Sequence, residues 1–303
     1  QVNFYKGLYS QEADVQNTAA AIDEFIADAN IPRLSSQEAE ACEGPITLKE
    51  TSKALYVMKN GSAPGCDGLT VEFMKFFWNK LGTVVTQSLD DAFERGDLSY
   101  SQKQGVIILI HKGKELPREQ LTNWRPITLT NTDYKIIAKV LALRLSLVIQ
   151  TIINEDQVGY LKGRNICSVL RTIDDVIDYC NQTGKGGYLL AQDTSKAFDS
   201  ISKQFLLEAF NVFGFGAQFR KWVSVITSGS MSCINHAGWL SEPFKVTCGI
   251  RQGCPFSPLA YVLAVELMAI KIRHSSIKGI TLPSPEKESA HLKIKQLADD
   301  TTL

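Results

Sequence analysis

The sequence predicts an α+β protein in which helices flank an antiparallel sheet. Apolar residues at helical spacing recur along the chain, for example at residues 134–153 and 259–273. Short apolar runs rich in β-branched residues lie between them, of which 104–111 is the clearest. The last eight residues, QLADDTTL, have the pattern of a strand, a tight turn and a second strand. A chain of 303 residues is long enough to bury a sizeable core as one large domain or two.

The first 45 residues are expected to hold one helix and a linker. Residues 11–29 carry apolar side chains at helical spacing, and the pattern ends before Pro32. These apolar residues are Val15, Ala19, Ile22, Phe25, Ile26 and Ala29. The polar, acidic stretch that continues through Pro45 is expected to be a linker.

Two further helices are expected before the first strand. Thr47 and Glu50 form a capping box for a helix that ends near residue 60. A loop rich in Gly and Pro, 61–70, then leads into an aromatic helix at 71–82.

Two strands and a basic turn follow. Residues 104–111 suit a buried strand, 112–119 a basic turn, and 123–131 a second strand. Pro126 places this second strand at an edge or a bend, because proline cannot donate to a ladder of hydrogen bonds.

A long helix is expected over residues 134–153. Its apolar residues form one stripe, made of Ile137, Val140, Leu141, Leu145, Val148, Ile149 and Ile152. Lys135, Lys139 and Arg144 lie largely off this stripe. We therefore expect the helix to pack its apolar face and leave a basic flank free.

The second half of the chain is expected to alternate strands, helices and turns. The expected elements are a strand at 187–193, helices at 203–214 and 217–227, a hairpin around 236–239, a turn-rich loop at 249–258 and a helix at 259–273.

Three aspartates stand at the ends of expected strands. Asp299 and Asp300 lie at the turn of the final strand pair, and Asp193 ends a much earlier strand. A strand end and a hairpin turn can lie side by side in one antiparallel sheet, so we expect three carboxylates at one edge. Such an edge suits two hard divalent cations, which can hold the attacking and leaving oxygens of a phosphoryl displacement. Taken alone, an Asp–Asp pair is more typical of a plain turn.

Composition excludes several classes of protein. Hydrophobic residues make up 44% of the chain and charged residues 21%, which is typical of a globular protein. The chain lacks an uncharged apolar run of about 18 residues, which argues against a membrane span. The seven cysteines show no CxxC spacing and the histidines do not cluster with them, which argues against zinc. Reduced thiols and the absence of a targeting signal favour an intracellular location, in the nucleus or cytoplasm.

The formal net charge of zero hides an uneven distribution. Residues 1–50 carry nine acidic residues against three basic ones, whereas residues 103–171 carry eleven basic residues against five acidic ones. A basic middle behind an acidic front is typical of a module that faces a polyanion. A solvated surface of mixed charge is an equal alternative, and the basic run at 103–118 has the same two interpretations.

Seven blocks of sequence carry more information together than any one motif. In chain order they are SAPGCDGLTVEFMKFFW, GVIILIHKGKE, NWRPITLTNTDYKIIAKVLALRL, QVGYLKGRNI, DTSKAFDS, GIRQGCPFSPLAYVLAVE and LADD. In order and spacing they resemble the reverse transcriptase domain of non-LTR (LINE-type) retrotransposons, over nearly the whole chain. The resemblance implies the fingers and antiparallel palm sheet of a right-hand polymerase. It divides the chain into a helical acidic leader (1–45), a fingers-like nucleic-acid and nucleotide-binding region (46–187) and a palm (188–303).

The resemblance also implies RNA-directed DNA polymerisation. A primer 3′-hydroxyl attacks a dNTP on an RNA template, and two Mg²⁺ ions, or Mn²⁺ in their place, assist. The implied partners are an RNA template, a DNA primer or target site and a dNTP, with no membrane. Catalysis and metal binding are assigned to Asp193, Asp299 and Asp300.

Further residues match positions that contact the nucleotide or the template. Lys112 and Arg125 are assigned to the triphosphate, Phe198 to screening of the sugar 2′ position, and Gln252 to the nucleotide pocket beside the template. The basic residues expected to follow the template backbone are Lys135, Lys139, Arg144, Lys162 and Arg164.

Each assignment has a structural alternative. Asp193 would then be a turn or cap residue, Arg125 the partner of a nearby Glu, Phe198 a core aromatic, and Gln252 a partner of loop amides. For Asp199 we expect capping of the following helix rather than metal binding.

The sequence departs from the family pattern at two positions and at its ends. Leu297 replaces an aromatic, and Gln192 replaces an aliphatic residue and would need a partner if buried. The chain opens without an initiator Met and stops soon after Asp300, so we expect a fragment that lacks the thumb and the upstream endonuclease. Two alternatives stay open: a non-catalytic nucleic-acid-binding remnant of a decayed element, and a group II intron-type reverse transcriptase.

Overall fold

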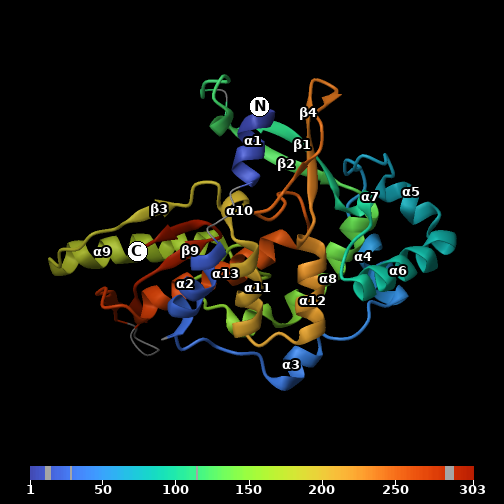
Figure 1. Ribbon diagram of the computed structural model, residues 1–303. Helices are drawn as coiled ribbons and strands as arrows, with labels where there is room; N and C mark the ends of the chain where they lie inside the picture. Colours follow the sequence, from blue (N-terminus) through green and yellow to red (C-terminus); the bar gives the residue numbers. More distant parts are fainter. Residues whose placement is uncertain (11–14, 28, 114, 284–289) are drawn as a thin grey trace.

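The computed structural model describes residues 1–10, 15–27, 29–113, 115–283 and 290–303. It is a mixed α+β fold, as the sequence predicts. A bundle of helices forms the centre of the molecule, and a larger sheet rises from one end of it (Figure 1). A smaller sheet, which contains the C-terminus, lies beside the bundle.

The α-helices of the described residues are α1 (Val2–Tyr9), α2 (Val15–Ala27), α3 (Ser36–Glu40), α4 (Leu48–Tyr56), α5 (Val71–Phe76), α6 (Trp78–Arg95), α7 (Tyr100–Lys103), α8 (Thr132–Ile152), α9 (Ile166–Thr183), α10 (Ala197–Ser200), α11 (Lys203–Val212), α12 (Ala217–Thr227) and α13 (Ser257–His274). The strands are β1 (Gln104–His111), β2 (Trp124–Thr130), β3 (Ala191–Asp193), β4 (Met231–His236), β5 (Trp239–Leu240), β6 (Phe244–Lys245), β7 (Ile280–Leu282), β8 (Ala290–Leu292), β9 (Lys295–Leu297) and β10 (Asp300–Thr302).

Helix α8 is the centre of the main core. It packs against α4, α12 and α13, and its Leu141 and Leu145 are fully buried. The helix has neither Gly nor Pro in its 21 residues, so its backbone ladder is uninterrupted. The predicted long helix and its apolar stripe are confirmed.

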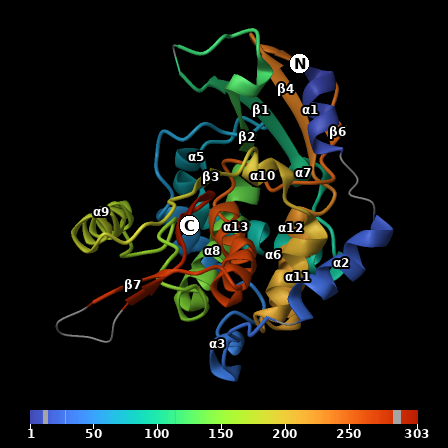
Figure 2. The ribbon, with the colours of Figure 1, turned by 90° about the vertical axis from the view of Figure 1, so that its left-hand side faces the viewer.

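The larger sheet has the strand order β2–β1–β4–β5, and β6 also pairs with β4. Strands β1 and β2 are antiparallel, whereas β1 and β4 are parallel. Because β2 is an edge strand, Pro126 removes no ladder bond from the interior of the sheet, which confirms its predicted edge position. In a second view (Figure 2), α1 lies beside β4 and β6 of this sheet.

The smaller sheet is antiparallel, in the order β3–β10–β9. Strands β9 and β10 form the predicted final hairpin, and β3 is the strand predicted to end at Asp193. Gln192 in β3 is exposed to solvent, so it needs no buried partner.

Several elements differ from the expectations. The stretch expected as a linker contains α3, whose N-terminus is stabilised by a capping box of Ser35 and Glu38. The aromatic helix is divided at Phe77 into α5 and α6. The predicted capping box of Thr47 is confirmed, but α4 ends at Tyr56, earlier than expected. Residues 11–14 and 28 of the first expected helix, and residue 114 of the basic turn, lie outside the described residues.

Candidate active site

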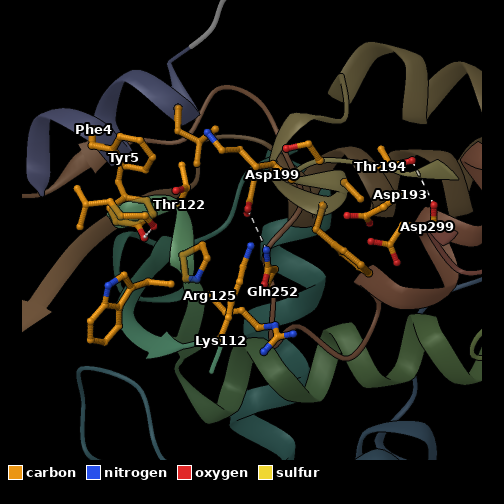
Figure 3. Close-up of a pocket in the computed structure, with 18 of the residues that line it drawn as sticks. Phe4, Tyr5, Lys112, Thr122, Arg125, Asp193, Thr194, Asp199, Gln252 and Asp299 are labelled. Atoms are coloured by element: carbon orange, nitrogen blue, oxygen red, sulfur yellow. Dashed lines mark hydrogen bonds between the residues drawn. The ribbon is translucent and has the colours of Figure 1, made fainter. Parts of the chain in front are cut away.

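A cavity of about 720 Å³ opens between the two sheets, with α1 and α10 on its walls (Figure 3). It is lined at one end by the three aspartates Asp193, Asp299 and Asp300, and at the other by Lys112 and Arg125. The cavity therefore has an acidic end on the smaller sheet and a basic end on the larger sheet.

The acidic end is assembled by strand pairing. Asp193 ends β3, and Asp300, which begins β10, is its direct partner across the antiparallel ladder. Directly opposed residues in such a ladder have Cα atoms about 4.5–5.5 Å apart. Asp299 is in the turn before Asp300, and its carbonyl oxygen accepts a 3.2 Å hydrogen bond from the Thr194 hydroxyl. The expected meeting of the three acids at one sheet edge is thus seen.

The electrostatics of this end favour a cation. Burial is the main reason that the pKa of Asp299 lies above its usual range, and the negative charges of Asp300 and Asp193 raise it further. A bound divalent ion would remove this repulsion, and the donor atoms are the carboxylate oxygens that Mg²⁺ and Mn²⁺ accept. In the described part of the chain, however, no three His, Cys, Asp or Glu side chains are already grouped to hold an ion. The donors fit in kind and number, and their side chains must still turn toward a common point.

The basic end is held by the β1–β2 ladder. Lys112 follows β1, and its backbone N–H donates a 2.9 Å hydrogen bond to the carbonyl of Asn123. Arg125 lies in β2 opposite Ile110. Both side chains are exposed and line the cavity. Among the described residues Arg125 forms no ion pair with a Glu, which leaves its guanidinium available to a ligand.

Phe198 combines packing with a position on the cavity wall. Its ring stacks on that of Tyr261, with centroids 4.8 Å apart, and it contacts the main core. It also lines the cavity, together with Tyr160, whose ring centroid is 6.4 Å away. The sequence pattern indicated either core packing or a place in the site. In the structure the ring packs against the core and also lines the cavity.

Gln252 is bound to Asp199, which corrects the expectation that Asp199 caps a helix. Its amide Nε2 donates a 2.9 Å hydrogen bond to Oδ2 of Asp199, and the Tyr9 hydroxyl donates a 2.8 Å bond to Oδ1. The cap of α11 is Ser202, whose hydroxyl accepts from the backbone N–H of Phe205. Asp199 is too deeply buried to cap a surface helix, at 3% exposure.

Burial also governs the charge of this carboxylate. It raises the pKa of Asp199 to about 6, against the opposing effect of the bonds from Tyr9 and Gln252 and of the charges of Lys196 and Lys112. Tyr9 has its pKa raised, first by burial and then by the adjacent Asp199.

The sequence analysis missed the contribution of α1. Phe4, Tyr5 and Leu8 of this helix line the cavity, and the Lys196 ammonium lies 4.9 Å from the centre of the Phe4 ring. Tyr5, Leu8 and Tyr9 are buried at the spacing of one helical face, and this spacing was the available signal.

Arg144 was expected on a solvent-exposed basic flank of α8, but it is buried. Its side chain is 6% exposed, with Nε 2.7 Å from the Glu50 carboxylate. Nη2 also donates a 3.0 Å hydrogen bond to this carboxylate, and the guanidinium donates to the carbonyls of Cys42, Gly44 and Pro45. Arg144 therefore ties the N-terminal segment to α8 and does not face solvent, because Glu50 and the segment at residues 42–45 cover it.

The other basic residues expected to contact the template differ in exposure and in hydrogen bonding. Lys135 donates to the carbonyl of Ala63 at 2.6 Å, and burial lowers its pKa. Arg164 donates to the carbonyls of Ile153, Asn154 and Gln157. Lys139 is half-buried and Lys162 is exposed. Lys162 is thus the member of the expected set that is most open to a partner.

Comparison with known proteins shows the family of this chain. Residues 110–303 match the family model described as "Reverse transcriptase (RNA-dependent DNA polymerase)", which is more than half of the chain. This chain belongs to the reverse transcriptase family. The resemblance stated from the seven sequence blocks is confirmed.

The relatives of this reverse transcriptase domain are proteins of retrotransposons. The chain is 34% identical over 302 residues to the "Transposon TX1 uncharacterized 149 kDa protein" of Xenopus laevis, covering 99% of this chain and 22% of that protein. It is 26% identical to the Pol polyprotein of the retrotransposable element R2DM of Drosophila melanogaster, covering 68% of this chain and 19% of the relative. It is 23% identical to the "Probable RNA-directed DNA polymerase from transposon X-element" of the same species, covering 72% of this chain and 24% of the relative. The chain therefore spans about a fifth of the length of these relatives.

Two further features concern membrane-spanning helices and disulfides. In the part of the chain that the structure describes, no helix has the length and apolarity needed to cross a membrane. Within the same residues the seven cysteines form no disulfide.

Proposed function

We propose that this chain forms the fingers and palm of a right-hand polymerase and carries out RNA-directed DNA polymerisation on behalf of a non-LTR retrotransposon. In this proposal residues 46–187 contribute most of the fingers and residues 188–303 the palm. The N-terminal region, 1–45, adds α1 to the nucleotide pocket. The observation that carries the proposal is that one cavity joins three strand-end carboxylates to two free basic side chains.

The cavity suits a nucleoside triphosphate and the end of a primer. Asp193, Asp299 and Asp300 would hold the two metal ions, which when bound supply charge neutralisation for the attacking and leaving oxygens. Lys112 and Arg125, at the opposite end, would bind the triphosphate through charge-assisted hydrogen bonds. The primer 3′-hydroxyl would lie at the acidic end, near Asp193.

Phe198 and Gln252 would set the choice of nucleotide. The Phe198 ring is held against Tyr261 at the cavity wall, so it is well placed to exclude a sugar with a 2′-hydroxyl by steric contact. The side-chain amide of Gln252 is fixed by Asp199, and its backbone carbonyl accepts a 2.8 Å hydrogen bond from the Thr128 N–H. A side chain restrained in this way is suited to contact the base pair without being displaced.

The template would follow the remaining basic surface. Lys162 and Lys139 are the more available cations of the expected set, and such contacts bind phosphates without reading sequence. Arg144 has no part in this surface because its hydrogen bonds are used within the protein.

The main alternative is a non-catalytic remnant that binds nucleic acid. The presence of all three aspartates and both basic residues on one cavity favours the enzyme over the remnant. A group II intron-type enzyme is the alternative within the same chemistry, and two R2 relatives, which are named as products of retrotransposable elements, favour the first proposal.

The deciding experiment is primer extension by an Asp193→Asn variant. The chain is placed in the TX1-encoded protein of Xenopus laevis in exchange for the matched region, and extension on an RNA template is measured. Asp193→Asn is expected to abolish extension with template affinity nearly unchanged, whereas Asp90→Asn, an exposed change on α6 outside the cavity, is expected to have no effect. Near-normal extension by Asp193→Asn would remove this residue from the metal site and overturn the proposal.

A further inference from the structure

The turn that carries Asp299 lies against a segment from a distant part of the chain, residues 156–159. Gln157 and Ala298, the first residue of the turn, are 141 positions apart in the sequence. Gln157 is fully buried, at 0% exposure, although its side chain is polar. A buried amide must find partners for both its donor and its acceptor, so its bonds identify what it holds.

Gln157 pairs with both backbone groups of Ala298. Its Oε1 accepts a 2.8 Å hydrogen bond from the Ala298 N–H, and its Nε2 donates a 3.2 Å bond to the Ala298 carbonyl. The same Oε1 also accepts from the N–H of Gly159 at 2.8 Å. One side chain thus fixes the whole backbone of the residue immediately before Asp299.

The backbone on both sides of Gln157 reinforces the contact. Val158 donates its N–H to the carbonyl of Gln296 at 2.9 Å, and Gln296 donates to Asp156 at 2.8 Å. At Gly159 the two chains are so close that a Cβ atom would lie 2.4 Å from the nitrogen of Ala298. A glycine is therefore required at this position.

Ala298 needs such support because of its conformation. Its φ of 56° lies in the left-handed region, which residues with a Cβ atom rarely adopt and which glycine would adopt without strain. A two-residue hairpin turn calls for positive φ at this point, so the chain places an alanine there and holds it from outside. If the bonds from Gln157 were lost, the turn would be free to relax, and Asp299 would move with it.

We propose that Gln157 is a positioning residue for metal binding: its amide fixes the turn at Ala298 and Asp299, so that Asp299 and Asp300 stay opposite Asp193. Gln157 itself touches neither metal nor substrate. This inference rests on the proposed function, because it assumes that the acidic end binds divalent ions. Groups that orient metal ligands from behind in this way change metal affinity by about 10–100-fold when removed.

The test is the binding of Mn²⁺ alone, measured by electron paramagnetic resonance of the free ion in the full chain. Gln157→Met keeps the length of the side chain and removes its hydrogen bonds. It is expected to weaken Mn²⁺ binding by about tenfold or more, with template affinity retained. The matched control is Gln296→Met, since Gln296 is equally buried in the same hairpin but bonds to the Thr301 hydroxyl instead of the turn. This control is expected to keep the affinity of the parent protein.

A second variant covers the case in which Gln157→Met does not fold. Gly159→Ala leaves Gln157 in place and pushes directly on Ala298, and it is expected to weaken Mn²⁺ binding in the same way. Unchanged Mn²⁺ affinity in both variants, or equal losses in Gln157→Met and Gln296→Met, would overturn the inference. The proposed function is tested separately by Asp193→Asn: if that variant also binds Mn²⁺ like the parent protein, the metal site itself is misplaced.

Discussion

The hydroxyl of Tyr9 donates a 2.8 Å hydrogen bond to the carboxylate of Asp199, 190 positions further along the chain. Asp199 in turn accepts from Gln252, so the N-terminal helix and the loop at residues 249–258 are joined through one buried carboxylate. The backbone agrees, because the Tyr9 carbonyl accepts from the N–H of Thr247 at 2.9 Å. Helix α1 is therefore a fixed wall of the cavity.

We first predict that Tyr9→Phe loosens this wall. Removing the hydroxyl leaves one oxygen of buried Asp199 without its donor, which costs about 1–3 kcal/mol of unfolding free energy. The KM for dNTP is also expected to rise more than kcat falls, because the carboxylate that holds Gln252 is less firmly fixed without the Tyr9 hydroxyl. Denaturant unfolding and steady-state kinetics measure the two effects.

Tyr5→Phe is the matched control for that variant. Tyr5 lies on the same helix and lines the same cavity, but its hydroxyl makes only a long, 3.4 Å bond to the Leu121 carbonyl. A loss in Tyr5→Phe as large as that in Tyr9→Phe would contradict the role given to Asp199.

The second prediction concerns pH. The pKa of Asp199 is raised from 3.8 to about 6 in the folded protein, so the folded state keeps a proton that the unfolded state releases between these values. The contribution of Asp199 to stability therefore falls as pH rises through this window and stays low above it. Relative to Asp199→Asn, the native protein is expected to lose roughly 2.5 kcal/mol of unfolding free energy between pH 4 and pH 7. A pH-independent difference between the two proteins would show that the carboxylate is not desolvated.

The third prediction separates the two roles of Phe198. Phe198→Ala is expected to raise rNTP incorporation relative to dNTP, because the ring no longer occupies the space beside the sugar. Phe205→Ala also removes a partly buried ring from the core but opens nothing in the cavity, so it is expected to lower stability without changing the ratio. If both variants keep the native ratio, packing is the only role of Phe198.

The fourth prediction concerns the arginine that the sequence placed on the nucleic-acid surface. Arg144→Met leaves buried carbonyls and Glu50 unpaired, and is expected to cost about 3–5 kcal/mol of stability. Under conditions where the variant is folded, the salt dependence of template binding is expected to be unchanged. Fluorescence anisotropy with an RNA–DNA hybrid at several salt concentrations measures this slope.

Lys162→Met is the opposite case and serves as the comparison. Lys162 is exposed, so its loss is expected to change stability by no more than about 0.5 kcal/mol. It is expected to reduce the salt slope by about one. If template binding by the parent protein did not depend on salt, the proposal that a basic surface binds the template backbone would be wrong.

The elements best predicted from the sequence are those whose pattern is local. The capping box of Thr47 and Glu50, the edge strand marked by Pro126 and the acidic hairpin at Asp299 depend on neighbouring residues, and each is found in the structure. The meeting of Asp193 with the Asp299–Asp300 turn at one sheet edge was also predicted, because a strand end and a hairpin turn can lie side by side in one antiparallel sheet.

The features that sequence reasoning missed depend on distant partners. Arg144 has the same local pattern as an exposed lysine, and only the carbonyls at residues 42–45 decide that it is buried. Asp199 precedes a helix in the way a cap does, but Tyr9 and Gln252 bind it instead. Helix α9 was also missed, although Ile166, Val169 and Leu170 have the apolar spacing of a helical face.

The parallel pairing of β1 with β4 limits how such a molecule can flex. Cys233 and Ile234 lie beside Val106 and Ile107. One sheet therefore holds strands from both sides of residue 187, the proposed boundary between fingers and palm. If Lys112 and Arg125 bind the nucleotide as proposed, a movement of β1 and β2 toward it carries β4 and β6 along, because strand pairing joins them in one sheet. Any hinge would then lie below the sheet, in the connections that join it to the helical bundle.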